Sequence, residues 1–133
     1  MSVSFGNSFN LHEQALHLQA RRTELLSANL ANAETPHYKA KDFDFKSSLQ
    51  AAVRNPFGSK VLEETNLKHI QPNKLDARFE TLYRMPFQTS LDGNTVESQV
   101  EMSEFNDNAI RYMATLRFLN GKIQTLMSAI RGD

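Results

Sequence analysis

A pair of histidines near the start of the chain comes closest to a catalytic arrangement. The HExxH motif of zinc proteases places two histidines at positions i and i+4, on one face of a helix, where both bind the metal. In this sequence His12 and His17 are five residues apart, so on a helix their imidazoles would point about 140° away from each other. We therefore predict two polar surface histidines here and no metal site.

No other group of residues has the spacing that a catalytic or cofactor site needs. His37 and His69 have no acidic or thiol neighbours at ligand spacing, and the chain contains no cysteine. There is no nucleophile with a base at a recognisable distance and no glycine-rich phosphate loop. Lys and Arg total 15, as do Asp and Glu, so no net charge attracts nucleic acid or an anionic membrane. The sequence predicts a protein that is not an enzyme and carries no cofactor.

The strongest pattern in the chain lies in its last third and predicts a long helix that starts near Ser98. Glu101 follows Ser98 at the spacing of a capping box, and acidic residues precede basic ones along the segment. Apolar residues recur there at alternating steps of three and four, which is typical of a helix lying along a partner helix. This heptad line consists of Met102, Phe105, Ala109, Tyr112, Leu116, Leu119, Ile123, Leu126 and Ile130.

The same helix carries more apolar residues than one contact line needs. Burying nine side chains gives roughly 1.5–3 kcal/mol each, whereas ordering about thirty residues costs roughly 1–2 kcal/mol each in backbone entropy. The heptad line alone therefore falls short, and either a helical core within one chain or contacts with neighbouring subunits must supply the rest. The four additional apolar residues are Ile110, Met113, Phe118 and Met127.

A second helical pattern covers residues 10–33. Leu11, Leu18 and Leu25 repeat every seven residues and would form the contact line of this helix. Asn10 is the predicted N-terminal cap. The helix must stop before Pro36, because proline pushes the preceding residue into an extended conformation.

Residues 37–97, between the two long helices, are predicted to be irregular with short β-strands. Residues 41–45 and 77–85 alternate in polarity, which favours short extended segments. Asp44 is placed to cap a brief helix, and residues 91–94 form a predicted turn.

Together these patterns predict a mainly α fold. We expect residues 1–36 and 98–133 to pair as an antiparallel coiled coil in one helical core domain, with residues 37–97 as its middle segment. The first fourteen residues contain neither Lys nor Arg and no apolar block, so we expect no cleavable secretory signal. No apolar run approaches the roughly 20 residues of a membrane span. The protein would then stay in the cytoplasm or leave by a route that reads no such signal.

Two segments resemble the bacterial flagellar rod and hook protein family. Residues 27–39, SANLANAETPHYK, are similar to the pattern S-x-N-(L/I)-A-N-x-x-T-P-G-Y near the N-terminus of that family, and residues 90–97 and 119–122 strengthen the likeness. His37 stands where the family usually has glycine, and we interpret the turn there as tolerant of a side chain. The residues that carry the signature are Asn29, Leu30, Asn32, Thr35, Pro36 and Tyr38.

The resemblance implies a structural protein of the proximal rod in the flagellar basal body. The rod is the part of the basal body that spans the periplasm. The terminal helices of such a protein would line a helical tube around the export channel and transmit torque. Expected partners are the other rod proteins, the adaptor that joins the rod to the membrane ring and export gate, and the flagellar type III export apparatus. The resemblance implies no enzymatic activity, metal, cofactor or nucleic acid. A soluble coiled-coil adaptor or chaperone of the export system is the alternative, because it needs only the heptad line.

The segment that precedes the first helix suggests an export signal. Phe5 and Phe9 fit the F-x-x-x-Φ pattern, which resembles the gate-recognition element of rod and hook export substrates. On a helix the two rings would share one face, and pairing as a β-strand is an alternative way of docking. Packing of both rings on the long helices after assembly is equally open.

Overall fold

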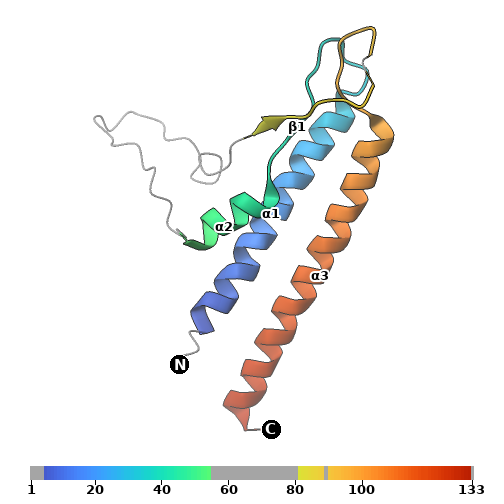
Figure 1. Ribbon diagram of the computed structural model, residues 1–133. Coiled ribbons are helices and arrows are strands. Elements are labelled where there is room, and N and C mark those ends of the chain that lie inside the picture. Colours follow the sequence, from blue (N-terminus) through green and yellow to red (C-terminus); the bar gives the residue numbers. More distant parts are fainter. Residues whose placement is uncertain (1–4, 55–80, 89, 133) are drawn as a thin grey trace, which may run out of the picture.

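Two long antiparallel helices dominate the structure, a computed structural model that describes residues 5–54, 81–88 and 90–132. Helix α1 (Phe5–Ala31) and helix α3 (Ser98–Arg131) lie side by side over much of their length (Figure 1). The predicted pairing of an N-terminal and a C-terminal helix in a mainly α fold is confirmed.

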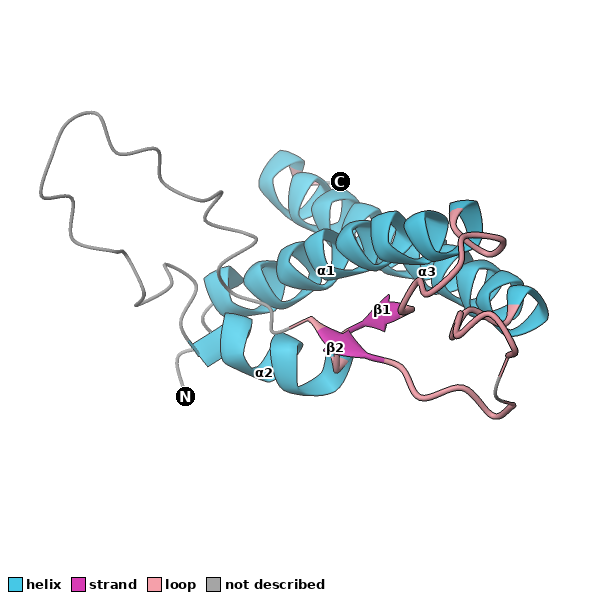
Figure 2. Cartoon of the chain, turned by 90° about the horizontal axis from the view of Figure 1, so that it is seen from above, coloured by secondary structure: helices cyan, strands magenta, loops and turns pink. Residues whose placement is uncertain are grey.

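The middle of the chain adds three short elements to this pair. Helix α2 (Phe45–Arg54) packs on α1, while β1 (Lys41–Asp42) and β2 (Leu82–Tyr83) form an antiparallel two-stranded sheet. In this sheet Lys41 lies opposite Tyr83, and Asp42 lies opposite Leu82. Seen from above, α2 and the sheet lie on the same side of the α1–α3 pair (Figure 2). The opposite side of the pair carries no other element of the described chain.

The N-terminal helix starts earlier than its sequence pattern indicated. It begins at Phe5, so Asn10 is not its cap and instead accepts a hydrogen bond from Gln14 Nε2 at 3.3 Å within the helix. At the other end, the N–H of Asn32 is shared between the carbonyls of Ala28 and Asn29, at 3.2 and 3.1 Å. This tightened last turn closes α1 before Pro36, as predicted.

The capping box predicted for α3 is wrong, although the helix does begin at Ser98. Glu97 is the N-cap and makes no side-chain cap hydrogen bond. The Glu101 side chain is 1% exposed and turns into the protein, where it serves tertiary contacts described below. At its C-terminal end α3 closes on Gly132, whose φ of 78° and 3.0 Å bond to the Ser128 carbonyl form a left-handed cap.

The short elements of the middle segment follow the prediction in part. Asp44 caps α2 as expected, since its Oδ1 accepts the N–H groups of Lys46 and Ser47 at 3.0 and 3.3 Å. The second predicted strand is reduced to β2, and residues 77–80 lie outside the described residues. Leu82 and Tyr83 of β2 are both exposed, so the alternation does not hold across the strand, and only Arg84 after it turns inward. Charge pairing, rather than apolar burial, therefore decides which side of this strand faces the helices.

The apolar core is small and centres on α1. Leu18 and Leu26 are fully buried, whereas Leu11 is exposed and Leu25 is only half-buried. Of the predicted contact line on α1 the structure thus buries only Leu18, and Leu26 was not foreseen. Among the residues that the structure describes, the other buried apolar side chains are Ala15, Ala40, Phe43 and Ala52.

Helix α3 faces α1 through polar residues more than through its apolar heptad line. Its two buried residues are Glu101 and Asn108, and Thr115 continues the same spacing of seven; we call these three the polar line. Phe105, Leu119 and Leu126 of the heptad line flank it and are half-buried. The remaining members are exposed in the single chain, except for the half-buried Ala109: Met102, Tyr112, Leu116, Ile123 and Ile130.

Candidate functional site: the junction between the long helices

Asn29, near the end of α1, organises the chain that follows the helix. Its side chain is fully buried. Its Nδ2 donates to the carbonyl of Lys41 at 2.8 Å, and its Oδ1 accepts the N–H of Lys41 at 2.9 Å. The Asn29 amide thus binds both the N–H and the carbonyl of Lys41, as the backbone of a neighbouring strand would. The same Nδ2 lies 3.1 Å from Glu101 Oε2, so Asn29 joins α1, β1 and α3.

An ionic cluster of five charged side chains lies beside Asn29. Arg22 of α1 binds both carboxylate oxygens of Asp42, at 3.2 and 3.0 Å, and reaches Glu104 Oε2 at 3.0 Å. Arg84, next to β2, donates to Asp42 Oδ2 and, at 2.6 Å, to Glu101 Oε1. The cluster therefore links every described element except α2.

The electrostatics of the cluster favour its charged form. Burial alone would raise the pKa of Asp42, but the hydrogen bonds from Arg22, from the Phe43 N–H and from Arg84 outweigh it and hold this pKa below its usual value. The hydrogen bond to Asp42 raises the pKa of Arg22 against the opposing effect of burial. Removing one member of such a pair destabilises the protein, because the remaining charge would stay buried without a partner.

Asn94 holds the turn that follows α1 from a distant part of the chain. Its side-chain Nδ2 points at three backbone carbonyls, those of Asn32, Ala33 and Thr35, at 3.1, 2.7 and 3.0 Å. These carbonyls belong to the turn that follows α1, so Asn94 fixes the path of the chain just after the helix ends. Asn94 is buried, so this contact fixes where the segment before α3 meets the end of α1.

The segment that leaves α1 is held between the turn before α3 and β2. The Tyr38 carbonyl accepts the N–H of Thr95 at 3.0 Å, and Thr95 Oγ1 accepts the N–H of Ala40 at 2.8 Å. The Ala40 carbonyl then accepts the N–H of Arg84 at 2.9 Å. These hydrogen bonds tie the segment after α1 to the turn before α3 and to the residue after β2.

The turn at His37 is strained, which corrects our interpretation of a tolerant turn. His37 has a φ of 62°, a left-handed conformation that glycine adopts freely and that costs other residues about 1–2 kcal/mol. Its N–H is fixed by the Asp92 carbonyl at 3.0 Å. Gly93 packs against the imidazole, since a Cβ added there would lie 2.9 Å from His37 Nδ1. The glycine at this second turn is therefore required both by its φ of 71° and by space.

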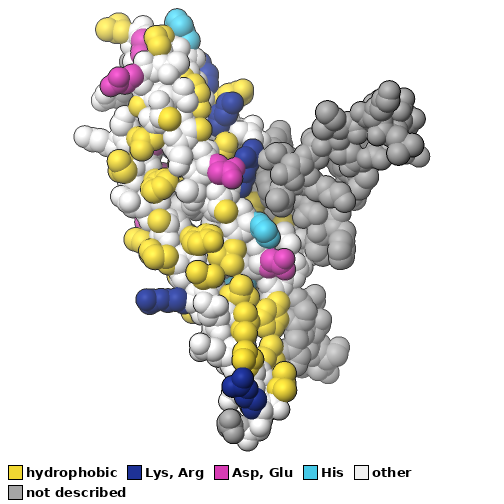
Figure 3. All heavy atoms as spheres, turned by 180° about the vertical axis from the view of Figure 1, so that it is seen from behind, with side chains coloured by type: hydrophobic (Ala, Val, Ile, Leu, Met, Phe, Trp, Pro, Cys, Tyr) yellow, Lys and Arg dark blue, Asp and Glu magenta, His cyan; other side chains and the backbone are white. Residues whose placement is uncertain are grey.

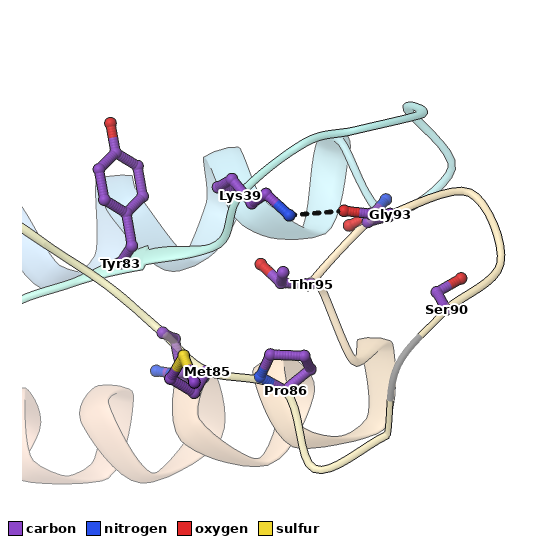
Figure 4. A pocket seen from close by; sticks show the side chains of 9 residues that line it. Lys39, Tyr83, Met85, Pro86, Ser90, Gly93 and Thr95 are labelled. Atoms are coloured by element: carbon purple, nitrogen blue, oxygen red, sulfur yellow. Dashed lines mark hydrogen bonds between the residues drawn. The ribbon is translucent and has the colours of Figure 1, made fainter.

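A shallow hollow of about 310 Å³ lies beside this junction (Figure 4). Lys39 extends along it and donates to the Gly93 carbonyl at 2.9 Å. Met85 is largely exposed and Pro86 is half-buried, so the hollow has an apolar wall and an open mouth.

A second set of polar contacts aligns the two long helices along the polar line. Asn108 Nδ2 donates to the Gln19 carbonyl at 2.8 Å and to Thr23 Oγ1 at 2.9 Å. Gln19 Nε2 donates to Thr115 Oγ1 at 3.2 Å, whereas Gln19 Oε1 is buried without a hydrogen-bond partner. Buried polar pairs in helix–helix contacts specify alignment at some cost in stability.

His12 and His17 both lie on α1 but differ in their surroundings. His12 is half-buried against Phe118, with ring centroids 6.4 Å apart, and His17 is exposed. Within the described ranges no three His, Asp or Glu side chains are grouped to hold a metal ion. None of the described helices is long and apolar enough to cross a bilayer.

Comparison with known proteins decides the family. A family model described as flagella basal body rod protein matches residues 9–39. A flagellar basal body rod protein FlgB from Cereibacter sphaeroides is 46% identical over 131 residues, covering 98% of this chain and 99% of the relative. FlgB of Aeromonas hydrophila is 42% identical over 100% of this chain and 99% of its own length. FlgB of Salmonella typhimurium is 37% identical over 94% of both chains. This chain belongs to the FlgB family.

The stretch that the family model matches covers most of α1 and the start of the junction. Within the signature, Asn32 Nδ2 donates to the Ala28 carbonyl at 2.8 Å, Thr35 Oγ1 donates to Asn32 Oδ1 at 3.2 Å, and Tyr38 lies 3.5 Å from Asn29. Leu30 is half-buried and Pro36 is exposed. The structure thus brings the polar members of the FlgB signature into one hydrogen-bonded unit.

Several residues of the junction were missed by sequence reasoning. Arg22 interrupts an apolar stripe, which marks it as a charge directed at the protein interior. Arg84 and Glu101 carried no such local signal, because their partners are remote in sequence. Asn94 was assigned only to a turn, although its side chain also binds the turn that follows α1.

Removal of the Asp42 carboxylate should destabilise this FlgB chain in a pH-dependent manner. Asp42→Asn leaves Arg22 and Arg84 without their shared anion, so we expect a loss of roughly 2–3 kcal/mol in free energy of unfolding at pH 7, below the full cost for a buried pair because Asp42 is partly exposed. Because the pKa of Asp42 is lowered in the folded state, its contribution is present above about pH 4 and is lost as pH falls through the lowered value.

The difference in unfolding free energy between wild type and Asp42→Asn, measured in urea from pH 7 downward, should therefore shrink below about pH 4. Asp107→Asn is the matched control, because it removes an exposed pair with Arg111 at 3.4 Å that is worth at most about 1 kcal/mol. Equal effects of the two variants at pH 7 would contradict the role of the ionic cluster.

Replacement of His37 by glycine should stabilise the protein. His37→Gly relieves the left-handed strain, and we expect a gain of about 1 kcal/mol, read as a higher urea midpoint at an unchanged slope. His37→Ala removes the same imidazole but keeps a Cβ at positive φ, so it should give no gain. If both variants behave alike, the strain at His37 does not limit stability.

Proposed function

We propose that this chain is a structural subunit of the flagellar rod that joins neighbouring subunits through the outer side of α3. The observation that carries the proposal is a set of large apolar side chains left in solvent along that helix. We call this set the outer face of α3; its members are Met102, Ile110, Met113, Leu116, Ile123, Met127 and Ile130.

The outer face of α3 is unusual for a surface in water. Ile110 is 62% exposed, Met113 is 56% exposed and Ile130 is 84% exposed. Figure 3 shows hydrophobic side chains gathered along this side of the molecule, opposite α2 and the sheet. Contiguous exposed apolar surface of this kind marks interaction sites in soluble proteins. Phe118, predicted with the same group, lies elsewhere on the helix against His12.

Contacts of different faces on successive subunits account for a tubular rod. Such heterologous contacts generate open helical arrays when their rotation does not close a ring. The rigid junction suits a part that transmits torque around an export channel, because the ionic cluster and Asn94 couple the two helices. We infer partners among the other rod proteins, the adaptor that joins the rod to the membrane ring and export gate, and the type III export apparatus, and a purely structural role without catalysis.

Charges on the outer face of α3 should block entry into the rod. Met113→Glu and Ile123→Glu place carboxylates where a subunit contact would desolvate them, so we expect loss of the protein from purified basal bodies and loss of swimming. Thr125→Glu is the matched control, since Thr125 is exposed on the opposite side of the same helix. Immunoblots of isolated basal bodies measure incorporation, and circular dichroism confirms that the variants fold. Wild-type incorporation of both outer-face variants would refute the proposal.

Export is a second part of the proposed role. Phe5 and Phe9 lie in the first turns of α1, where residues four apart share a helix face. We propose that this face docks at the export gate. Phe5→Ala and Phe9→Ala should then lower the secreted amount at an unchanged cellular level, whereas Leu91→Ala, at a fully exposed turn, should not. Normal secretion with failed rod assembly would assign both rings to packing.

A further inference from the structure

The outer side of α1 is also left open, and its chemistry is opposite to that of α3. Exposed residues recur along it at alternating steps of three and four, and none of them is a large apolar side chain. We call this stripe the outer face of α1; it consists of Glu13, His17, Ala20, Glu24, Ser27 and Ala31.

The two outer faces adjoin each other on one side of the helical pair. A groove of about 380 Å³ between the helices is lined by Ala20 and Thr23 from α1 and by Ala109, Tyr112 and Met113 from α3. Figure 3 looks onto the side that α2 and the sheet leave uncovered. Both outer faces are therefore uncovered on this side of the single chain.

The faces are complementary in size. The outer face of α3 presents long side chains such as Met113 and Met127, whereas the outer face of α1 presents Ala20, Ser27 and Ala31. Helices pack when ridges of side chains on one enter grooves on the other, at interaxial distances of about 8–10 Å that depend on side-chain size. Small residues on one helix let the large residues of another approach closely.

The faces are also complementary in charge. The charged residues on the outer face of α1 are Glu13 and Glu24, and residues 108–132 contain no acidic residue but include Arg117 beside the outer face of α3. Among the described residues Glu13 and Arg117 make no ion pair, while Glu24 is already bound by Arg21 at 2.6 Å. Glu13 and Arg117 are thus each available to a partner.

We propose that the outer face of α3 in one copy packs against the outer face of α1 in a second copy standing beside it at the same height, with Arg117 of one copy paired to Glu13 of the other. The height follows from contacts within the chain, where His12 lies opposite Phe118 and Gln19 lies opposite Thr115. These contacts place Glu13 at the height of Arg117 within one chain. A second copy that stands in the same orientation and at the same height therefore also has its Glu13 level with Arg117 of the first copy. The inference rests on the proposed rod function and adds to it the identity of one neighbour.

Cysteine cross-linking tests the contact, because the chain has no cysteine of its own. Purified full-length Ala20→Cys is mixed with full-length Ile110→Cys under mild oxidation, so that any heterodimeric disulfide must join two copies. We expect this heterodimer to form in preference to either homodimer. Arg111→Cys replaces Ile110→Cys as the control, because it lies at the same height but about 100° around the helix, and it should not cross-link to Ala20→Cys.

The ion pair is tested in the same assay. Glu13→Arg or Arg117→Glu alone should lower the yield of the heterodimer about two- to fivefold, the range for an exposed ion pair, and the double exchange should restore it. Glu34→Lys makes the same change of net charge as Glu13→Arg, away from the contact, and should have no effect.

The outcomes separate this inference from the proposed function. Absence of the heterodimer, equal yield with the Arg111→Cys control, or failure of the double exchange to restore the yield would overturn the contact between copies. If Met113→Glu still blocks entry into the rod in that case, the outer face of α3 serves a different rod protein and the proposed function stands.

Discussion

Glu101 is a carboxylate on a helix that the fold takes almost completely out of water. Buried charge is tolerated only with close partners, and Arg84 and Asn29 provide them at 2.6 and 3.1 Å. Arg84 is in turn paired with Asp42, and Asp42 is paired with Arg22. This single constraint draws together the end of α1, both strands and the first turns of α3. It also explains why a two-residue sheet persists, since β1 and β2 are held by Asn29 and by the ionic cluster as much as by each other.

Helix α3 directs its polar line toward α1 and most of its long apolar side chains away from α1. Glu101, Asn108 and Thr115 face α1, where α1 satisfies Glu101 and Asn108 through Asn29, Gln19 and Thr23. Most of the long apolar side chains face away or lie at the edge of the contact. An ordinary two-helix protein would do the reverse, because apolar burial stabilises and polar burial costs. The arrangement suits a chain whose apolar surface is meant for other molecules.

Features that depend on neighbouring residues could be predicted from the sequence, and features that depend on remote partners could not. The two long helices follow from heptad spacing, the cap at Asp44 from local chemistry, and the stop of α1 from Pro36. The capping box failed because Glu101 serves Arg84, which lies far away in sequence. The heptad repeat also predicted that the apolar line of α3 contacts another helix. A repeat of seven shows which side of a helix is apolar, but it does not show which helix that side contacts. The glycine that the family signature usually has at the position of His37 did signal a left-handed turn, but the backbone bond from His37 to the Asp92 carbonyl that holds it could not be read from local sequence.

The hydrogen bonds along the polar line have a mechanical consequence. Apolar side chains can slide past one another and re-form equivalent contacts, but Asn108 meets the Gln19 carbonyl and Thr23 at one position only. Shifting α3 along α1 by one turn, about 5.4 Å, would break these bonds together with the bonds that Glu101 makes at the junction. Shear between the helices is therefore opposed at several points at once. Under axial load the two helices therefore act as one stiff unit.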